Sequence, residues 1–544
     1  MARSKLKSQH NRVMPTPYQG WLSPLRHVSF RSLWLVWLSA NICMWMNDVA
    51  AAWVMTFLTD SATLIALVQT ASSLPVLLLG VPSGSLADIL NKKSFFIFTQ
   101  IWLTVNALLL FFLALFNLLN PYLLLFLTFT NGVGLAMRWP IFLSTVPSLV
   151  PKNALQPALA LSAIAMNLSR IFGPLIAGAI ISFAGPEFVF AANFFISLIS
   201  IIWVFKWRYE HTASALPPER LLSAMRLGIQ YALQTNQIKF VLLRAFCFYF
   251  QSSGIIALLP IIAKSNLNGG ANTFTLLLSF LGVGAIFSGY LMSRLRNKLN
   301  TTQFSNYGVF VLALSASGLA FSRSIYIAVV MSFICGMAWM WIANSLTTSA
   351  HLSLPNWVRA RGMSLYQIGL MSGSALGAAS WGLITDYSSV TIGLLSSGIF
   401  GLISLIFIHK IFIHHYLTDE SLPVCPLERP SSNNTADPGI GPVMISIEYC
   451  IPINNIPEFK DVMKEIRQSR KRQGCISWSL FRDSENMEIY TENFAFSNWG
   501  DYLRRFDRFT SSDLALHERR DLLQKNNKQP IIKRRIGFTI DGAV

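Results

Sequence analysis

An acidic residue, Asp48, stands inside the long apolar stretch ANICMWMNDVAAAWVMTFLT at residues 40–59. A charge in the middle of a membrane is energetically costly, so such a carboxyl group usually faces water or an oppositely charged partner. Its affinity for a proton changes with its burial and with the charges around it. Asp48 is therefore a candidate for reversible proton binding.

Arg170 is a second charge of this kind, in the apolar stretch at residues 154–184. Asp48 and Arg170 each lie about 17 residues from the same end of their stretches, a similar depth at about 1.5 Å per helical residue. We therefore expect the two to be neighbours. Three interpretations stay open: proton coupling by Asp48 beside Arg170, a static structural pair, or direct contact of Asp48 with a bound molecule. The candidate lining of a shared cavity is Asn41, Trp45, Asn47 and Asn167.

The composition indicates which kind of element holds these residues. Apolar residues make up 53% of the 544-residue chain and charged residues only 12%, whereas soluble domains carry about 25% charged residues. The mean hydropathy is +0.47. These values predict a polytopic membrane protein with a soluble part attached. The net charge of +18 lies mostly in short loops, so nucleic acid is not an expected partner.

Twelve transmembrane helices are predicted, because a membrane-spanning helix needs about 20 mostly apolar residues. They lie at residues 31–58, 63–86, 94–118, 121–143, 154–184, 187–206, 238–263, 272–294, 303–321, 324–350, 360–384 and 389–413. Loops after even-numbered helices hold 13 Lys and Arg residues, and loops after odd-numbered helices hold two, Lys264 and Arg323. Basic loops stay in the cytoplasm, so we expect both termini there. Arg244 lies near a cytoplasmic end, where a long basic side chain reaches the lipid headgroups.

The chain has six predicted parts. They are a cytoplasmic N-terminal segment (1–30), a six-helix bundle (31–206), a cytoplasmic loop with an amphipathic helix (207–237), a second six-helix bundle (238–413), a linker (414–441) and a cytoplasmic tail (442–544). The segment SGSLADILNKK after the second predicted helix is echoed by SGYLMSRLRNK after the eighth. Such correspondence indicates a duplicated six-helix unit with a binding site between the halves.

The loop GSLADILNKK resembles the signature loop of the major facilitator superfamily, with Ile89 and Asn91 in place of the usual Arg and Gly. The resemblance implies that Asp88 bonds to the N-terminus of a helix in the other half and locks one conformation. Arg138 lies near the same end, and either pairs with Asp88 or reaches the lipid headgroups. The candidate gating residues are Gly84, Asp88, Lys92 and Lys93 of this loop, together with Arg138.

The segment NLSRIFGPLIAGAII resembles the Gly-Pro motif of exporters in this superfamily, with matches at Gly173, Pro174 and Gly178. Glycine and proline permit close helix contact and a bend. The resemblance implies outward transport in exchange for protons. Glycine-rich packing without directional meaning is the alternative.

Longer segments, among them WMNDVAAAWVMTFLTDSATLIALVQTASSLPVLLLGVPSGSLAD, narrow the resemblance to transmembrane secretion effectors, the subfamily with the bacterial enterobactin exporter. It implies a multi-pass exporter of a siderophore-like molecule in the bacterial inner membrane. A broad-specificity drug efflux pump is the alternative. The sequence has no GxxxxGK[ST] phosphate-binding loop, and we expect no ATP drive, no cofactor and no metal site.

The tail reads as strand, helix, two strands, helix and strand, the order of the ferredoxin-like fold. It resembles the antibiotic-biosynthesis monooxygenase-like domains, which commonly pair into dimers. Because no nucleophile, metal set or cofactor loop stands out, we expect a regulatory or dimerising role and not an enzyme. A membrane-anchored enzyme or sensor acting through this tail is the rival interpretation.

Overall fold

The structure of the chain is a computed structural model. It describes residues 22–89, 91–151, 154–206, 229–295, 298–355, 358–412, 439–525 and 530–537. Most of the predicted N-terminal segment, the amphipathic loop helix and the linker therefore lie outside the described residues.

Long helices account for most of the described residues between 28 and 412. In the described ranges they are α1 (Val28–Leu58), α2 (Ala62–Ile89), α3 (Lys92–Leu115), α4 (Pro121–Leu149), α5 (Leu155–Phe183), α6 (Pro186–Lys206), α8 (Asn236–Ile261), α9 (Ala271–Leu295), α10 (Thr301–Ala320), α11 (Ile325–Leu352), α12 (Arg359–Tyr387) and α13 (Val390–Phe412). Each apolar stretch predicted to span coincides with one helix. Among the described residues, nine of the helices are long and apolar enough to cross a membrane. Helix α1 is not among the nine, and it carries the polar residues Asn41, Asn47 and Asp48.

Polar residues mark where several of these helices begin. The Asn91 side chain accepts hydrogen bonds from the amides of Lys93 and Ser94 at the start of α3. Asn120 caps α4 in the same way through the amide of Leu123. A side-chain oxygen at this position satisfies backbone N–H groups that have no partner inside the helix. The short loops therefore fix where each apolar segment enters its helix.

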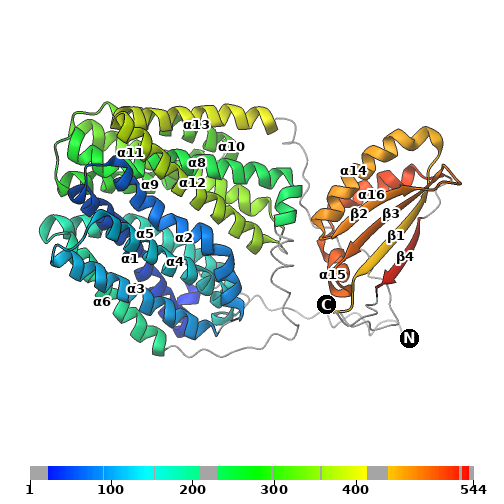
Figure 1. Ribbon diagram of the computed structural model, residues 1–544, viewed down its shortest axis with the longest axis horizontal. Coiled ribbons are helices and arrows are strands. Elements are labelled where there is room, and N and C mark those ends of the chain that lie inside the picture. The colour runs from blue at the N-terminus through cyan, green and yellow to red at the C-terminus, as the bar shows by residue number, and fades with distance from the viewer. Residues whose placement is uncertain are drawn as a thin grey trace, which may run out of the picture.

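The helices pack as two groups, α1–α6 (blue to cyan in Figure 1) and α8–α13 (green to yellow). The groups contact each other mainly along α2 with α12 and along α5 with α9. One apolar core crosses this boundary and includes Trp53 of α1, Phe274 of α9 and Trp339 of α11. The contacts between the groups are the places where their relative movement is controlled.

Two ends of the helical bundle matter for the site. The clamp end holds Asp60, Lys264 and Asp386. The motif end holds the end of α2 at Ile89 and the start of α3 at Lys92. A short π-helical turn, η3 (Ile262–Asn266), extends α8 at the clamp end and carries Lys264.

The tail contains one antiparallel sheet with the strand order β2-β3-β1-β4. The strands are β1 (Val443–Cys450), β2 (Ser477–Arg482), β3 (Ile489–Phe496) and β4 (Ile531–Ile536). Helices α14 (Ile456–Arg472), α15 (Trp499–Arg504) and α16 (Ser511–Leu522) connect them. Figure 1 shows this sheet and its helices, in orange and red, as a unit separate from the helical bundle.

One face of this sheet is buried and the other is open. Ile445 and Tyr449 of β1 pack with Phe459 of α14 in a single apolar core. Side chains alternate between the two faces of a strand, so the opposite face carries the neighbouring residues. On that face Met444 and Phe481 are 43% and 57% exposed.

Candidate functional site

Arg170 of α5 lies between the two helix groups against aromatic rings. The centre of its guanidinium group is 4.3 Å from the ring centroid of Trp339 on α11 and 5.4 Å from that of Trp45 on α1. Contacts of this kind stabilise a cation through the electron-rich ring face. Arg170 is thus held by one tryptophan from each group.

Two tyrosines of the second group complete these surroundings. Tyr249 of α8 and Tyr366 of α12 lie near enough to interact electrostatically with Arg170. Tyr249 also contacts Trp339, with ring centroids 5.9 Å apart, and the Tyr366 hydroxyl lies 3.2 Å from Thr347 Oγ1. We call Arg170, Trp45, Tyr249, Trp339 and Tyr366 the arginine cage.

Three N–H donors of the cage have no hydrogen-bond partner in the described residues. They are Nε of Arg170 and the Nε1 atoms of Trp45 and Trp339, and all three are buried. Burying a donor without a partner costs free energy. Within the described part of the chain, these three donors are therefore free to meet an acceptor.

Asp48 lies one helical turn beyond Trp45 on α1. Its Oδ1 atom is buried without a hydrogen-bond partner among the described residues. No ion pair or hydrogen bond joins Asp48 to Arg170 in that part of the chain. The static pair considered from the sequence is therefore not formed in this structure, and proton coupling stays a prediction.

The expected equal depth of the two charges is wrong. Ser169 donates a hydrogen bond to the carbonyl of Leu38, 3.2 Å away, and Gly173 packs against Trp45. The backbone of Arg170 is therefore level with about residues 39–42, roughly 9–14 Å before Asp48 along α1. Part of the difference arises because Asp48 lies 20 residues after the start of α1 at Val28, whereas Arg170 lies 15 residues after the start of α5 at Leu155. The two helix starts are also not level. The long arginine side chain makes up part of this distance.

The predicted asparagine lining is only partly placed at the cage. Asn41 and Asn47 are buried on α1, at 1% and 4% exposure. The Asn41 side chain donates to the carbonyl of Trp37, while Asn41 Oδ1 and Asn47 Nδ2 have no partner in the described residues. Asn167 is half-buried on α5, one turn before Arg170.

The Gly-Pro motif lies at two helix contacts. A methyl group added to Gly173 would lie 2.5 Å from Cβ of Trp45, so this glycine lets α5 approach α1. A methyl group on Gly178 would lie 2.2 Å from Cγ2 of Thr275 on α9, in the second helix group. Pro174 lies inside α5 between them. Because Gly173 and Gly178 have no side chains, α5 packs closely against both helix groups, and Arg170 of α5 lies at their junction.

At the clamp end, Asp386 of α12 caps the start of α2. Its Oδ1 atom accepts a hydrogen bond from the amide of Ala62 at 2.5 Å. Its Oδ2 atom accepts from the Ser61 hydroxyl at 2.7 Å and the Thr63 amide at 2.9 Å. An acidic group at a helix N-terminus meets both free N–H donors and the positive end of the helix dipole. The carboxylate therefore joins the two helix groups.

Lys264 makes a second connection at the clamp end. Its ammonium group donates to the carbonyl of Thr56 at the end of α1 and lies 3.6 Å from the Asp60 carboxylate. This pair is exposed, and such pairs stabilise by only about 0–1 kcal/mol. Lys264 therefore makes a second, weaker connection between the two helix groups at the end where Asp386 connects them.

At the motif end the structure describes only part of the predicted gate. Gly84 and Asp88 lie in the last turns of α2, but their side chains are outside the described part, so the Asp88–Arg138 pair stays a prediction. Lys92 and Lys93 begin α3, and Lys93 Nζ donates to the carbonyl of Phe205. Arg138 is 4% exposed and donates to the carbonyl of Ala40. The alternative in which Arg138 reaches the headgroups is therefore wrong.

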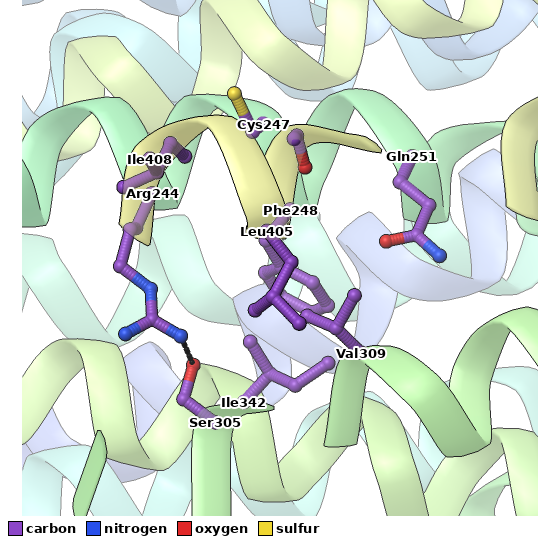
Figure 2. A pocket seen from close by; sticks show the side chains of 10 residues that line it. Arg244, Cys247, Phe248, Gln251, Ser305, Val309, Ile342, Leu405 and Ile408 are labelled. Atoms are coloured by element: carbon purple, nitrogen blue, oxygen red, sulfur yellow. Dashed lines mark hydrogen bonds between the residues drawn. The ribbon is translucent and has the colours of Figure 1, made fainter. Parts of the chain in front are cut away.

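Arg244 of α8 is also buried, contrary to the expectation that it reaches the headgroups. It donates to Ser305 at 2.9 Å and to Asn306 at 2.5 Å, both on α10. Figure 2 shows it beside a cavity of about 20 Å³ lined by Gln251, Phe248 and other residues of the second group. A cavity of this size holds about one water molecule. Arg244 therefore belongs to packing within the second group.

The tail contains a buried ion pair. Glu492 of β3 and Arg470 of α14 are fully buried, 3.0 Å apart, and Glu492 also accepts from Tyr449 and Trp478. Burial alone would raise the pKa of Glu492, but the Arg470 guanidinium outweighs it and lowers this pKa to about 2. Burial, followed by Arg470 and two other arginines, holds the pKa of His517 well below its usual value. Within the described residues no group of three potential ligands could hold a metal.

Sequence reasoning missed Asp386, Tyr249 and the functional meaning of Lys264. Lys264 is one of two basic residues in the loops expected to be poor in charge, and that exception was a usable signal. Asp386 ends an apolar helix next to a loop, where an acidic residue is ordinary. Its role depends on a partner more than 320 residues away in the chain.

The paired helix groups, with a buried charged site at their junction, define a membrane transporter of the major facilitator type. Residues 19–540 match the transmembrane secretion effector family of this superfamily, and the chain belongs to that family. The fold is shared with a bacterial homologue of the human lysosomal transporter Spinster, solved in an inward-facing, unoccupied conformation. That match has a TM-score of 0.58 and 14% identity and covers 71% of this chain and 97% of the homologue.

Three relatives in sequence are similar over most of their length. The MFS-type transporter YfiS of Bacillus subtilis is 24% identical over 66% of this chain and 89% of its own. The staphyloferrin A transporter of Staphylococcus aureus is 18% identical, over 54% and 72%. Macrolide efflux protein A of Streptococcus pyogenes is 22% identical, over 59% and 79%. The chain is accordingly a transporter of small molecules and not an enzyme.

Proposed function

We propose that the protein exports a small organic molecule, a siderophore or a compound like one, from the bacterial cytoplasm in exchange for protons. The observation that carries this proposal is the arginine cage, which lies between the helix groups and has donors without a partner in the described residues. The similarity to the staphyloferrin A transporter supports a siderophore as cargo. Twelve membrane-spanning helices, with the motif end and both termini in the cytoplasm, form the pathway.

Asp48 is the proposed proton-binding group. It lies one turn beyond Trp45, a member of the cage, and has a buried carboxylate oxygen with no partner among the described residues. In a cavity open to alternating sides, such a carboxyl group takes up a proton from one side and releases it to the other. Coupling follows when cargo at the cage and the proton on Asp48 favour different conformations, because each then shifts the same equilibrium.

Two sets of contacts at opposite ends are proposed to alternate. At the clamp end, Asp386 holds α12 to α2 in this structure. At the motif end, the loop with Gly84, Asp88, Lys92 and Lys93 is proposed to close when the clamp end opens. Thr70 lies level with Ala375 in the same antiparallel pair. Continuing this register brings residue 88 level with the start of α12 near Arg359.

The tail is proposed to be a ferredoxin-like domain that pairs two copies of the chain or regulates transport. Its strand order, β2-β3-β1-β4, supports this fold. The open face of its sheet exposes Met444, Phe481 and Ile531, which suits contact with a second copy. A hydrogen bond from Gln230 to the carbonyl of Cys475 joins the tail to the segment before α8.

Comparison of secreted metabolites tests the proposed cargo. Strains with and without the gene are grown in iron-rich and iron-poor medium, and intracellular and secreted compounds are measured by mass spectrometry. An iron-binding compound retained inside only in the deletion strain supports the proposal. No difference in any iron-binding compound contradicts the siderophore assignment.

Efflux of an antibiotic is the second candidate function, because macrolide efflux protein A is a relative of similar identity. In that case the deletion strain becomes more sensitive to macrolides and retains no metabolite. Susceptibility measured in the same two strains separates the two candidates.

A further inference from the structure

The arginine cage carries a positive charge that no acid of the described chain neutralises. No described carboxylate forms an ion pair with Arg170, and the groups around it are the rings of Trp45 and Trp339 and the hydroxyls of Tyr249 and Tyr366. Asp48, the acid predicted to pair with it, makes no bond to it. A buried charge is normally retained only with a partner. The described residues therefore do not supply this partner, and a ligand or solvent is left to do so.

The unpaired donors indicate what that partner must be. Arg170 Nε, Trp45 Nε1 and Trp339 Nε1 are all donors, and they are buried without an acceptor in the described residues. The tyrosine hydroxyls are the nearby groups able to donate as well as accept. A ligand with several acceptor oxygens and a negative charge satisfies all of these groups together.

Arginine has a preferred anion for geometric reasons. Its guanidinium group is planar and presents pairs of parallel N–H groups that match the two oxygens of a carboxylate. Contact with an aromatic ring stabilises the charge without using an N–H as a hydrogen-bond donor to oxygen. The cage thus orients the guanidinium group and keeps its donors available.

We infer that the cargo carries a carboxylate group and that Arg170 binds this group, with the indoles of Trp45 and Trp339 donating to the same anion. This inference deepens the proposed function and rests on it, since it assigns the cargo class of the same site. Arg170 comes from the first helix group, whereas Trp339, Tyr249 and Tyr366 come from the second. An anion in the cage therefore contacts both groups, and its arrival changes their relative stability.

Isothermal titration calorimetry on the full chain in lipid nanodiscs tests the inference. The probes are citrate, phthalate and benzoate, with phthalamide and benzamide as neutral counterparts. The wild-type protein is expected to bind at least one carboxylate more tightly than its neutral counterparts. The Arg170→Gln variant is expected to lose about tenfold in affinity for that carboxylate. Arg170→Lys keeps the charge without the planar pair of donors, and an intermediate loss is expected.

Arg244→Gln is the matched control, because Arg244 is also a buried arginine but bonds to Ser305 and Asn306 away from the cage. Its affinity for the carboxylate should equal that of the wild type. The inference is overturned if no carboxylate binds the wild type below about 10 mM, or if Arg170→Gln binds it as the wild type does. A variant that elutes as an aggregate is replaced by Arg170→Lys, whose unchanged affinity also overturns it.

Transport measured in liposomes with the same protein separates this inference from the proposed function. Carboxylate binding that depends on Arg170, without any gradient-driven transport, keeps the site and contradicts export. Gradient-driven transport of a neutral or cationic compound that is equal in wild type and Arg170→Gln keeps export and contradicts the anion site.

Discussion

The carboxylate of Asp386 accepts a hydrogen bond of 2.5 Å from the backbone amide of Ala62, the first residue of α2. The two residues belong to different helix groups, so this bond closes the clamp end of the bundle. Further bonds from Ser61 and Thr63 make the same carboxylate a complete cap for α2. Breaking the cap leaves three donors without their partner, and for that reason the contact controls how readily the clamp end opens.

Replacing Asp386 by Ala is expected to destabilise the closed clamp end by about 1 kcal/mol, the usual effect of losing a helix cap. The ratio of closed to open molecules should then fall about fivefold. Spin labels are placed at Leu118 and Arg323, on loops of the two helix groups at this end. Double electron–electron resonance spectroscopy should then show a longer distance between the two labels. The native cysteines are replaced first.

Glu187→Gln is the control for this measurement, since Glu187 lies at the clamp end but starts α6 within the first group. Its distance distribution should equal that of the wild type. If Asp386→Ala also leaves the distribution unchanged, the clamp does not control the opening.

Replacing Gly178 by Ala is expected to force α5 and α9 apart, because the added methyl group would lie within 2.7 Å of Cβ, Oγ1 and Cγ2 of Thr275. Overpacking of this kind typically costs about 1–3 kcal/mol. Cellular export should fall, and the clamp-end label distance should increase. The double variant with Thr275→Gly removes the overlap and should restore both readings.

A second glycine provides the comparison for Gly178. Nothing lies within 4 Å of a methyl group added at Gly80 on α2, so Gly80→Ala should export normally. Equal export by Gly178→Ala and Gly80→Ala would show that the close approach of α5 to α9 is not needed.

Replacing Glu492 by Gln is expected to unfold the tail while leaving the helical bundle intact. The change leaves Arg470 buried without its anion, and breaking a buried pair typically costs about 3–5 kcal/mol. Hydrogen–deuterium exchange of the full chain should show fast exchange in β1 and β3 and unchanged exchange in α11. Glu458→Gln, which breaks an exposed pair with Arg519, should leave the tail protected. Protection of β3 in Glu492→Gln would contradict this account of the tail.

The tail should also lose stability in acid. The folded pKa of Glu492 is lowered to about 2 from an ordinary value of 4.5. Its ionised form therefore contributes stability above about pH 4.5, and this contribution is lost as the pH falls toward 2. The full contribution is on the order of 3 kcal/mol. Pepsin cleavage of the intact protein should therefore spread into the tail between pH 4.5 and 2, and a cleavage rate that is flat across this range counts against the assignment.

Apolar length located the helices, because a bilayer imposes nearly the same length on each span. The depth of a residue along its helix, relative to residues of other helices, was harder to predict from the sequence. Asp48 and Arg170 were counted from ends that are not level. Helix α1 begins at Val28, three residues before the predicted start at residue 31, whereas α5 begins at Leu155, one residue after the predicted start at residue 154.

Partners across the bundle could not be read from the sequence at all. Nothing local to Arg170 indicates that Trp339 is its neighbour, and nothing local to Asp386 indicates α2. Such contacts depend on how two helix groups pack, which periodicity along one helix does not determine. The sequence identified the buried charged residues, but only the structure shows which residues they contact.

Proton-driven transport in liposomes tests the central claim most directly. The compound that metabolite profiling identifies as cargo is placed inside liposomes with the full chain, and its movement is followed under an imposed proton gradient. For Asp48→Asn, gradient-driven transport is expected to fall at least about tenfold, while exchange of labelled for unlabelled cargo without a gradient continues. Gradient-driven transport by Asp48→Asn at the wild-type rate, at every pH tested, would contradict proton coupling through this residue.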